Sequence, residues 1–158
     1  MVAERKDERI GMKIRAFREA DAPAATEILR TSPEAAQWTE FGFRELLGWH
    51  GVLALVGEED SKIIGFVVCR QVAVEAEILN LAIHLLRRRN GEGGVLLDAA
   101  MKELRIRKVS RLFLEVRESN APAIAFYMKH GFYKTGSRAG YYHNPEEAAT
   151  VMERKLTD

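Results

Sequence analysis

The chain has 158 residues and a hydrophobic fraction of 47%, values that suit one globular domain. With 24 basic and 23 acidic residues the net charge is +1, so nothing indicates nucleic-acid or anionic-membrane binding. Because no apolar run approaches the roughly 18 residues of a membrane span, and residues 1–12 lack an apolar signal segment, we expect a cytoplasmic protein with a flexible tail over residues 1–11 and a single domain over residues 12–158.

The first half of the chain predicts four strands and two helices. The apolar segments typical of strands span residues 12–17, 52–56, 63–72 and 77–83. A polar turn separates the second and third of these segments, which predicts a β-hairpin. One helix is expected to begin after Asp21, a good N-cap residue, with Pro23 in its first turn. A second helix is expected over residues 40–49.

The second half predicts two helices and three strands. These are a helix over residues 95–107, a strand over 111–116, a helix over 120–130, and strands over 132–136 and 150–156. The whole order predicts an α/β (α+β) fold, with one mixed central sheet of about six to seven strands flanked by helices. The segments 77–83 and 111–116 are expected to lie parallel, because a helix joins them and such crossovers are right-handed.

A charged, glycine-rich loop before the helix at 95–107 is the first candidate binding site. A helix N-terminus has unpaired N–H groups and a partial positive charge, and glycines let a bulky anion approach the backbone. Arg88 and Arg89 add positive charge, so the loop is suited to phosphate. It is neither a P-loop, which requires Lys and Ser or Thr after its glycines, nor a dinucleotide fingerprint, which requires glycine where Leu96 stands. A tight turn before a helix is the structural alternative.

Several segments resemble the GNAT acetyltransferase superfamily. The loop from Arg88 to Gly93 fits the superfamily signature Gln/Arg-x-x-Gly-x-Gly/Ala. Within the superfamily, the chain is most similar to the bacterial ribosomal-protein alanine N-acetyltransferases, from about residue 12 to the C-terminus. The segments that carry this closer resemblance are residues 38–40, 77–83, 114–121, 123–127, 131–132 and 138–142.

The resemblance implies an acetyl-CoA-dependent N-acetyltransferase that requires no metal. It implies that three residues offer backbone groups to the pantetheine arm: Leu81, Ala82 and Ile83. The residues implied to hold the pyrophosphate are Arg88, Arg89, Asn90, Gly91, Glu92, Gly93 and Gly94. Asn120 would hydrogen-bond the cofactor. Glu115 matches the general base of the family, and Tyr127 matches its general acid.

The loop region also departs from the family pattern at three places. His84-Leu85 replaces the usual Asp-Pro pair, Asn90 stands where Gln or Arg is common, and Gly94 stands where Arg is common. Backbone donors carry most of the phosphate binding in such a loop. We therefore expect cofactor binding to survive the departures, and the effect of His84 on the substrate side stays open.

The candidate residues also have simpler structural interpretations. Glu115 could be a partly solvated acid paired with Arg117 or Lys129, Tyr127 a packing residue, and Asn120 a helix cap. Tyr141 and Tyr142 are either sheet-packing residues or a wall for an acceptor peptide. The four histidines lack metal-ligand spacing, and Cys69 is expected to be a core thiol.

The sequence leaves the acceptor amine open. A protein α-amine has a pKa of about 7.7–8.0, so making it neutral at pH 7 costs about 1–1.4 kcal/mol, against about 4–5 kcal/mol for lysine. One carboxylate is an adequate base for that task. The leading hypothesis is transfer to a protein N-terminus, possibly that of a ribosomal protein, by direct attack in a ternary complex. The alternatives are a small-molecule amine N-acetyltransferase and a non-catalytic acetyl-CoA-binding module, against which Glu115 and Tyr127 argue.

Overall fold

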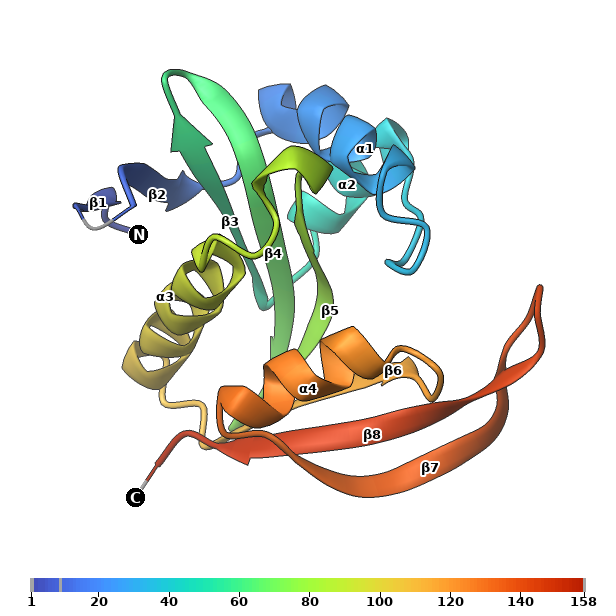
Figure 1. Cartoon of the computed structure of the whole chain (residues 1–158). Helices are drawn as coiled ribbons and strands as arrows, with labels where there is room; N and C mark the ends of the chain where they lie inside the picture. The colour runs from blue at the N-terminus through green and yellow to red at the C-terminus, as the bar shows by residue number, and fades with distance from the viewer. Residues whose placement is uncertain (1, 9, 158) are drawn as a thin grey trace.

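The protein is described by a computed structural model that covers residues 2–8 and 10–157, and this part of the chain forms one mixed sheet with helices on both faces (Figure 1). The strands are β1 Arg5–Asp7, β2 Met12–Ala16, β3 Val52–Glu59, β4 Lys62–Val72, β5 Glu75–Ile83, β6 Arg111–Arg117, β7 Tyr133–Tyr142 and β8 Glu147–Lys155. The α-helices are α1 Ala22–Arg30, α2 Glu40–Leu47, α3 Glu92–Ile106 and α4 Ala121–Lys129, with 3₁₀ turns η1 Glu19–Asp21 and η2 Leu85–Arg87. The predicted α/β class is confirmed, with eight strands in place of six to seven.

The additional strand comes from the segment expected to be a flexible tail. Arg5–Asp7 pairs antiparallel with β2, and the Arg5 guanidinium binds Glu103 of α3 at 2.7 Å. These three residues therefore belong to the edge of the sheet. Met1 and Arg9, which the expected tail also included, lie outside the described residues, as does Asp158 at the end of the expected domain.

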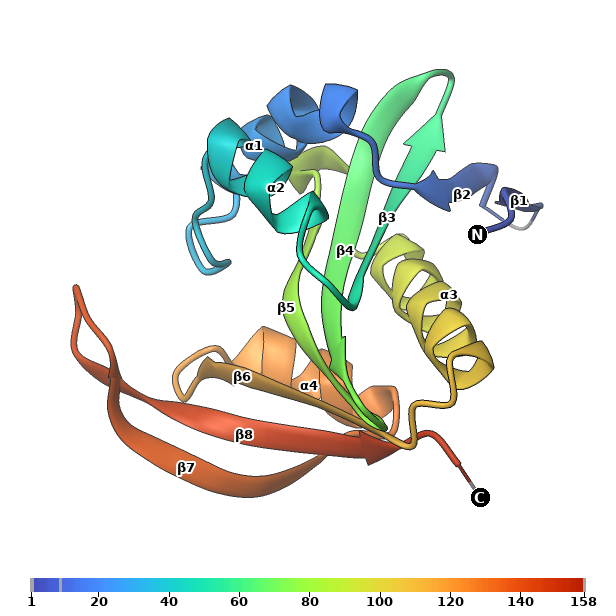
Figure 2. The ribbon, with the colours of Figure 1, turned by 180° about the vertical axis from the view of Figure 1, so that it is seen from behind.

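The strand order places one parallel pair in the middle of an otherwise antiparallel sheet. The order is β1-β2-β3-β4-β5-β6-β8-β7, and the predicted hairpin of β3 and β4 is present. The predicted parallel pairing of β5 with β6 is confirmed, but it joins only residues 75–77 to residues 111–113. Beyond that point the two strands diverge, as Figures 1 and 2 show from opposite sides.

Two apolar cores lie on the two faces of the sheet, and alternation along β4 separates them. Val67 and Cys69 belong to the core under α3 and α4, whereas Phe66 and Val68 belong to the core under α1 and α2. Successive side chains of a strand point to opposite faces, so α3 and α4 cover one face and α1 and α2 the other. The sheet therefore has one face covered by α3 and α4 and another covered by α1 and α2, and both faces border the gap where β5 diverges from β6.

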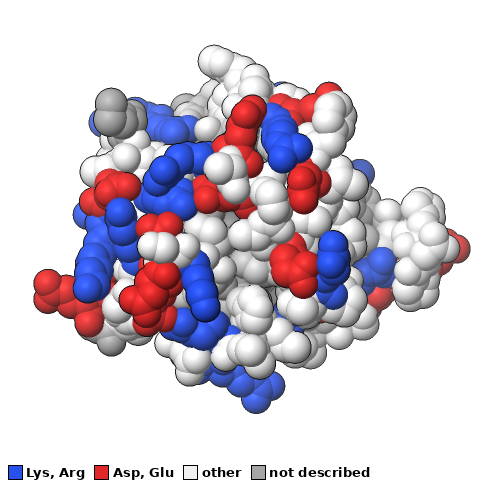
Figure 3. Space-filling view, turned by 90° about the horizontal axis from the view of Figure 1, so that it is seen from above, with Lys and Arg blue, Asp and Glu red and all other residues white. Residues whose placement is uncertain are grey.

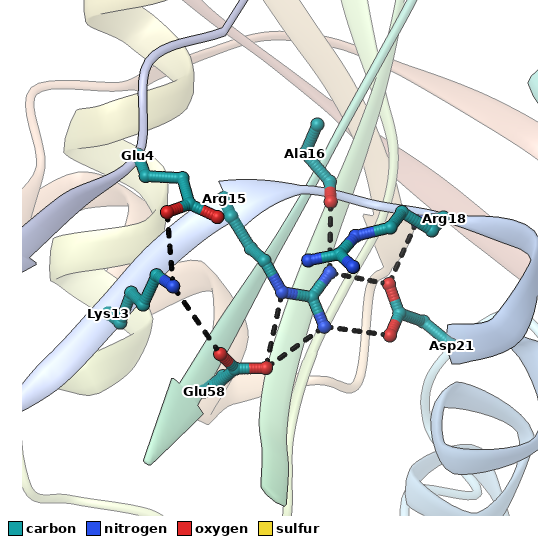
Figure 4. A network of polar contacts seen from close by, with 7 residues as sticks. All are labelled: Glu4, Lys13, Arg15, Ala16, Arg18, Asp21 and Glu58. Atoms are coloured by element: carbon teal, nitrogen blue, oxygen red, sulfur yellow. Dashed lines mark hydrogen bonds and ion pairs between the residues drawn. The ribbon is translucent and has the colours of Figure 1, made fainter. Parts of the chain in front are cut away.

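The two N-terminal helices begin where they were expected, but the predicted cap of α1 is absent, and α2 has a cap that was not predicted. In α2 the Thr39 hydroxyl accepts a hydrogen bond from the Gly42 N–H at 3.0 Å. Asp21 precedes α1 without capping it, because its carboxylate binds the guanidinium of buried Arg15 at 2.8 and 2.9 Å and the Arg18 N–H at 2.8 Å (Figure 4). Leaving a buried guanidinium without a charged partner costs more free energy than leaving a helix N-terminus uncapped, because water can bind the N–H groups of the helix.

The last two strands are longer than their apolar cores predict. β7 and β8 extend to Tyr142 and back from Glu147, over polar and glycine-containing residues, and their pairing is irregular between Arg138 and Tyr142. Backbone pairing with the neighbouring strand provides the hydrogen bonds that the sequence pattern does not reveal.

Charge is evenly mixed on the face seen from above, where basic and acidic residues are interspersed (Figure 3). This agrees with the net charge of +1. Among the helices described, none combines the length and the apolarity required to cross a membrane.

Candidate active site

The divergence of β5 from β6 creates a cavity in the middle of the sheet. The cavity has a volume of about 1390 Å³ and extends from the α1–α2 loop to the tip of the β7–β8 hairpin. The predicted site residues that line it are Leu81, Ala82, Ile83, Arg88, Arg89, Gly91, Gly93, Gly94, Glu115, Asn120 and Tyr127. Eleven of the thirteen predicted residues are thus brought together; within the described chain, Asn90 and Glu92 do not line the cavity.

The glycine loop forms the N-terminus of α3. Gly91 has a φ of +83° and precedes the helix in the left-handed conformation, which favours glycine. The Val95 N–H donates to Gly91 O at 3.2 Å, so the N–H groups of residues 92–94 lie in the first turn, where they lack intrahelical acceptors. This is the geometry that binds a phosphate group.

The Gly94 departure from the family pattern has a structural reason. A Cβ atom at Gly94 would lie 2.8 Å from His130 Cε1 and 3.0 Å from Nε2. The imidazole of His130 packs on Phe126, with ring centroids 4.7 Å apart, and it lines the same cavity. The histidine therefore occupies the space beside α3 that an arginine at position 94 would need.

Three of the predicted polar residues of the loop, Arg88, Asn90 and Glu92, are engaged by the protein itself. Arg88 Nη2 lies 2.6 Å from Ser32 Oγ and 3.0 Å from the Glu34 carboxylate, both in the loop between α1 and α2. Arg87 binds Glu92, whose side chain is 2% exposed. Burial beneath this ion pair explains why Glu92 does not face the cavity. Asn90 donates its amide N–H to Arg87 O at 3.3 Å.

Glu115 faces the gap because of its position in β6. Its neighbours Leu114 and Val116 point into the core that contains Tyr127, so Glu115 points to the opposite face. Glu115 Oε1 accepts a hydrogen bond from Arg138 Nη1 at 2.7 Å. Glu115 Oε2 is buried and accepts no hydrogen bond of good geometry among the described residues, although the Tyr141 hydroxyl lies near enough for the carboxylate to raise the pKa of that tyrosine. A buried carboxylate oxygen without a well-placed donor is unfavourable and is available for a substrate proton.

The predicted partners of Glu115 are wrong. Arg117 instead binds Glu147 at 3.3 Å and lies over the Tyr142 ring, 4.4 Å from the centroid. In β6, Arg117 is two residues beyond Glu115, and its cross-strand neighbours lie on β8. Arg138 reaches Glu115 from β7, which lies two strands away in the sheet. Because the two residues are far apart along the chain, no local sequence pattern predicted this contact.

Tyr127 is a packing residue that also reaches the cavity. Its ring packs edge-on against Phe126 and Phe132, with centroids 5.1 and 5.4 Å away, and it also lines the cavity. Burial raises the pKa of the Tyr127 hydroxyl well above its usual value near 10. The hydroxyl is therefore neutral over the physiological range and can donate a hydrogen bond.

Asn120 caps α4, as its structural interpretation predicts. Its Oδ1 atom accepts the Ala123 N–H at 3.2 Å. Asn120 and Tyr127 both line the cavity, which confirms that two helical turns place them on the same groove.

Three residues beside Glu115 were not predicted as site residues. Glu77 on β5 and Tyr141 on β7 line the cavity, and the Tyr141 ring lies 4.5 Å from the Arg138 guanidinium. Burial raises the pKa of Glu77, and the negative charge of Glu115 raises it further. A charged residue beside the mostly apolar segment from Ile78 to Ile83 was the available signal for Glu77. Tyr141 is therefore part of the cavity wall and not a sheet-packing residue.

A diverging parallel pair, a glycine-rich helix start and an acid beside the gap together define a class of enzyme. Residues 18–132 match the Acetyltransferase (GNAT) family, so the chain belongs to this family of acetyltransferases. The members of this family use acetyl-CoA as the acetyl donor, and the superfamily resemblance found in the sequence is confirmed.

The relatives of the chain include enzymes with a stated protein substrate. It is 35% identical over 134 residues to the ribosomal protein bS18 alanine N-acetyltransferase of Escherichia coli K12, covering 84% of this chain and 89% of that protein. Its identity to the corresponding enzyme of Salmonella typhimurium is 37% over the same shares. The crystal structure of the Escherichia coli enzyme superposes with a TM-score of 0.82 and 31% identity over 93% of this chain and 95% of that one.

Proposed function

We propose that this chain transfers an acetyl group from acetyl-CoA to the N-terminal α-amine of a protein, with the alanine N-terminus of a ribosomal protein as the first candidate. The observation that carries the proposal is the Glu115 carboxylate, which lies at the central gap with Oε2 buried and accepting no hydrogen bond of good geometry in the described chain. The relatives of the chain are alanine N-acetyltransferases of the ribosomal protein bS18. An acceptor of this kind also implies a cytoplasmic enzyme.

The volume of the cavity favours a protein acceptor over a small amine. Pockets for one small ligand usually have volumes of about 300–1000 Å³, whereas this cavity has about 1390 Å³. It reaches the hairpin residues Tyr141 and Tyr142 on one side and Trp38 on the other. That space suits a cofactor together with the end of a polypeptide.

The residues at the gap fit acetyl-CoA. The first turn of α3 offers backbone N–H groups for the pyrophosphate, and Gly91, which precedes it, has open space around its Cα, since a Cβ atom there would meet no atom within 4 Å. The carboxyl half of β5, with Leu81 to Ile83, pairs with β4 on one side and does not pair with β6 on the other. On that open side it offers backbone groups to the pantetheine arm. Asn120 would bind the cofactor from the start of α4.

The chemistry follows from the two faces of the sheet. When bound, acetyl-CoA supplies an activated thioester. Glu115 accepts the proton of the acceptor ammonium, so that the neutral amine attacks the thioester carbonyl directly in a ternary complex. Tyr127 donates a hydrogen bond to the departing sulfur from the opposite face, and the proton that the nitrogen loses as the amide forms neutralises the thiolate, so that CoA leaves as the free thiol. No covalent enzyme intermediate is required.

The test is acetyl transfer to peptides with a free N-terminal alanine, read by mass to locate the added acetyl group. Glu115→Gln is expected to reduce kcat/KM by roughly 10²- to 10⁴-fold, the usual contribution of a general base. Glu118→Gln, at an exposed position just after β6, is the matched control and should leave the rate unchanged. Turnover of small amines without turnover of any such peptide would refute the proposed acceptor.

A further inference from the structure

A cation of the chain itself covers the Glu115 carboxylate. Arg138 Nη1 lies 2.7 Å from Glu115 Oε1, and the guanidinium packs on the Tyr141 ring. Val151 of β8 pairs with Glu115 on one side and with Gly136 on the other. Arg138 follows Gly136 by two residues, so it lies on the same face as Glu115. From this face the guanidinium reaches across β8 to the carboxylate.

A second carboxylate lies in the same cavity. Glu77 lines it from β5, near enough for the charges of both Glu115 and Arg138 to act on it, the first raising its pKa and the second lowering it. Of these two acids, Glu115 is the one to which the guanidinium is hydrogen-bonded. Glu77 is left as an alternative partner for the same group.

The acceptor ammonium and the Arg138 guanidinium compete for the charge of one carboxylate, although they would bind its two different oxygens. Both are cations with N–H donors, and both must bind the Glu115 carboxylate, so their mutual repulsion disfavours occupation of the site by both. The Arg138 side chain is 56% exposed, and strand pairing is irregular directly after it. The side chain can therefore leave Glu115 without breaking the packed core.

We propose that Arg138 is a displaceable cap on the base: it holds Glu115 in the empty site and moves to Glu77 when the acceptor amine enters. The inference rests on the proposed function, for which Glu115 is the base. Arg138 and Glu77 are then positioning residues that control the access of a cationic acceptor, while Glu115 alone meets the reacting amine.

The test is a double-mutant cycle on the KM for an N-terminal alanine peptide at saturating acetyl-CoA. Arg138→Gln removes the competing charge and is expected to lower this KM by roughly 2- to 5-fold, the worth of a half-exposed ion pair. Glu77→Gln removes the alternative partner and is expected to raise the KM by a similar factor. In the double variant, Glu77→Gln should add nothing to Arg138→Gln. Arg138→Lys keeps the charge and is the control.

Two results would overturn the cap. A raised KM in Arg138→Gln would show that the guanidinium binds the acceptor, and an equal effect of Glu77→Gln with and without Arg138 would show that Glu77 binds the acceptor directly. If the unmodified chain acetylates small amines and no peptide, the proposed acceptor fails, and the same cycle with a small primary amine tests the cap. If the unmodified chain acetylates neither acceptor, the Kd of the peptide for the CoA-saturated protein is measured by calorimetry. The variants must then have the order of Kd values expected above for KM, and any other order overturns the cap.

Discussion

At the residue scale, strand alternation assigns the two candidate catalytic groups to different faces. Leu114 and Val116 are buried in the core beside Tyr127, and Glu115, between them, points the other way. The proposed base and the proposed hydrogen-bond donor can therefore meet only through the gap beyond the short β5–β6 pairing. A thioester in that gap would meet the amine activated by Glu115 at its carbonyl carbon and the Tyr127 hydroxyl at its sulfur.

Tyr127→Phe tests the donor without disturbing the packing. The ring contacts with Phe126 and Phe132 remain, and only the hydroxyl is lost. We expect kcat to fall roughly 10- to 100-fold, the worth of a hydrogen bond to a charged group, with the melting temperature nearly unchanged. Tyr133→Phe, at an exposed site on β7, is the control. An undiminished kcat in Tyr127→Phe would exclude the hydroxyl from the reaction.

Cys69 should be chemically silent in the folded protein. Its side chain is fully buried, and burial raises the pKa of the thiol to about 12, which the positive charge of Arg107 only partly opposes. Because the thiolate is the reactive form, labelling by a disulfide reagent at pH 8 should proceed only after unfolding. As this is the single cysteine of the chain, the absorbance of the released thiol reports it directly. Labelling of the native protein at the denatured rate would contradict the burial.

At the element scale, the approach of α4 to the start of α3 sets the shape of the phosphate site. Gly94 in the first turn of α3 leaves room for His130 at the end of α4. Meanwhile Arg88 and Asn80 hold the α1–α2 loop, Arg88 at Ser32 and Asn80 at Ala36 O, 2.9 Å away. Arg88 and Asn80 thereby link the proposed cofactor site to the α1–α2 loop, on the side where we propose that the acceptor binds.

Gly94→Ala tests this close approach. The new Cβ atom would lie 2.8 Å from the His130 ring, and overpacking of this kind costs about 1–3 kcal/mol of unfolding free energy, against a helix-propensity gain of up to about 1 kcal/mol. We expect net destabilisation in urea unfolding and a raised KM for acetyl-CoA.

His130→Ala in the same chain should relieve the clash and restore the stability of Gly94→Ala. Gly136→Ala is the control, because a Cβ atom there meets no atom within 4 Å. Failure of His130→Ala to restore stability would mean that the imidazole is not the limiting contact.

At the scale of the whole molecule, a buried ion-pair network ties the N-terminal elements to the sheet. Arg15 of β2 binds Asp21 of η1 and Glu58 of β3, and Lys13 extends the network to Glu4 (Figure 4). Burial alone would raise the pKa of Asp21, but the hydrogen bonds from Arg15 and from the Arg18 N–H outweigh it and lower that pKa. The pairing therefore stabilises the fold in a pH-dependent way.

Asp21→Asn tests the contribution of this network. Since the folded pKa lies below the unfolded value of about 3.9, the stabilisation is present above that value and is lost as the pH falls through the folded pKa. We expect Asp21→Asn to cost about 3–5 kcal/mol near neutral pH, as for other broken buried pairs, and progressively less below pH 4. Thermal unfolding from pH 3 to 7 measures the difference. Glu27→Gln, at an exposed pair, is the control, and a cost independent of pH would contradict the assignment.

The sequence by itself determined the features that depend on neighbours along the chain. Apolar alternation indicated the hairpin of β3 and β4, the helical crossover indicated the parallel pair, and the Asn120–Tyr127 spacing placed both residues on one groove. Glycines before a helix indicated the phosphate loop. These signals are readable because backbone geometry and hydrogen bonding act over a few residues.

Only the tertiary structure decided which charges meet. Arg138 of β7 binds Glu115 of β6 across the intervening strand β8. Arg88 of the glycine loop binds Ser32. Asp21 binds Arg15 and does not cap α1. The edge strand β1 and the gap beyond the short β5–β6 pairing also arise from contacts distant in sequence. Such choices depend on strand order, register and competition among buried charges, and local residue patterns carry no information about these.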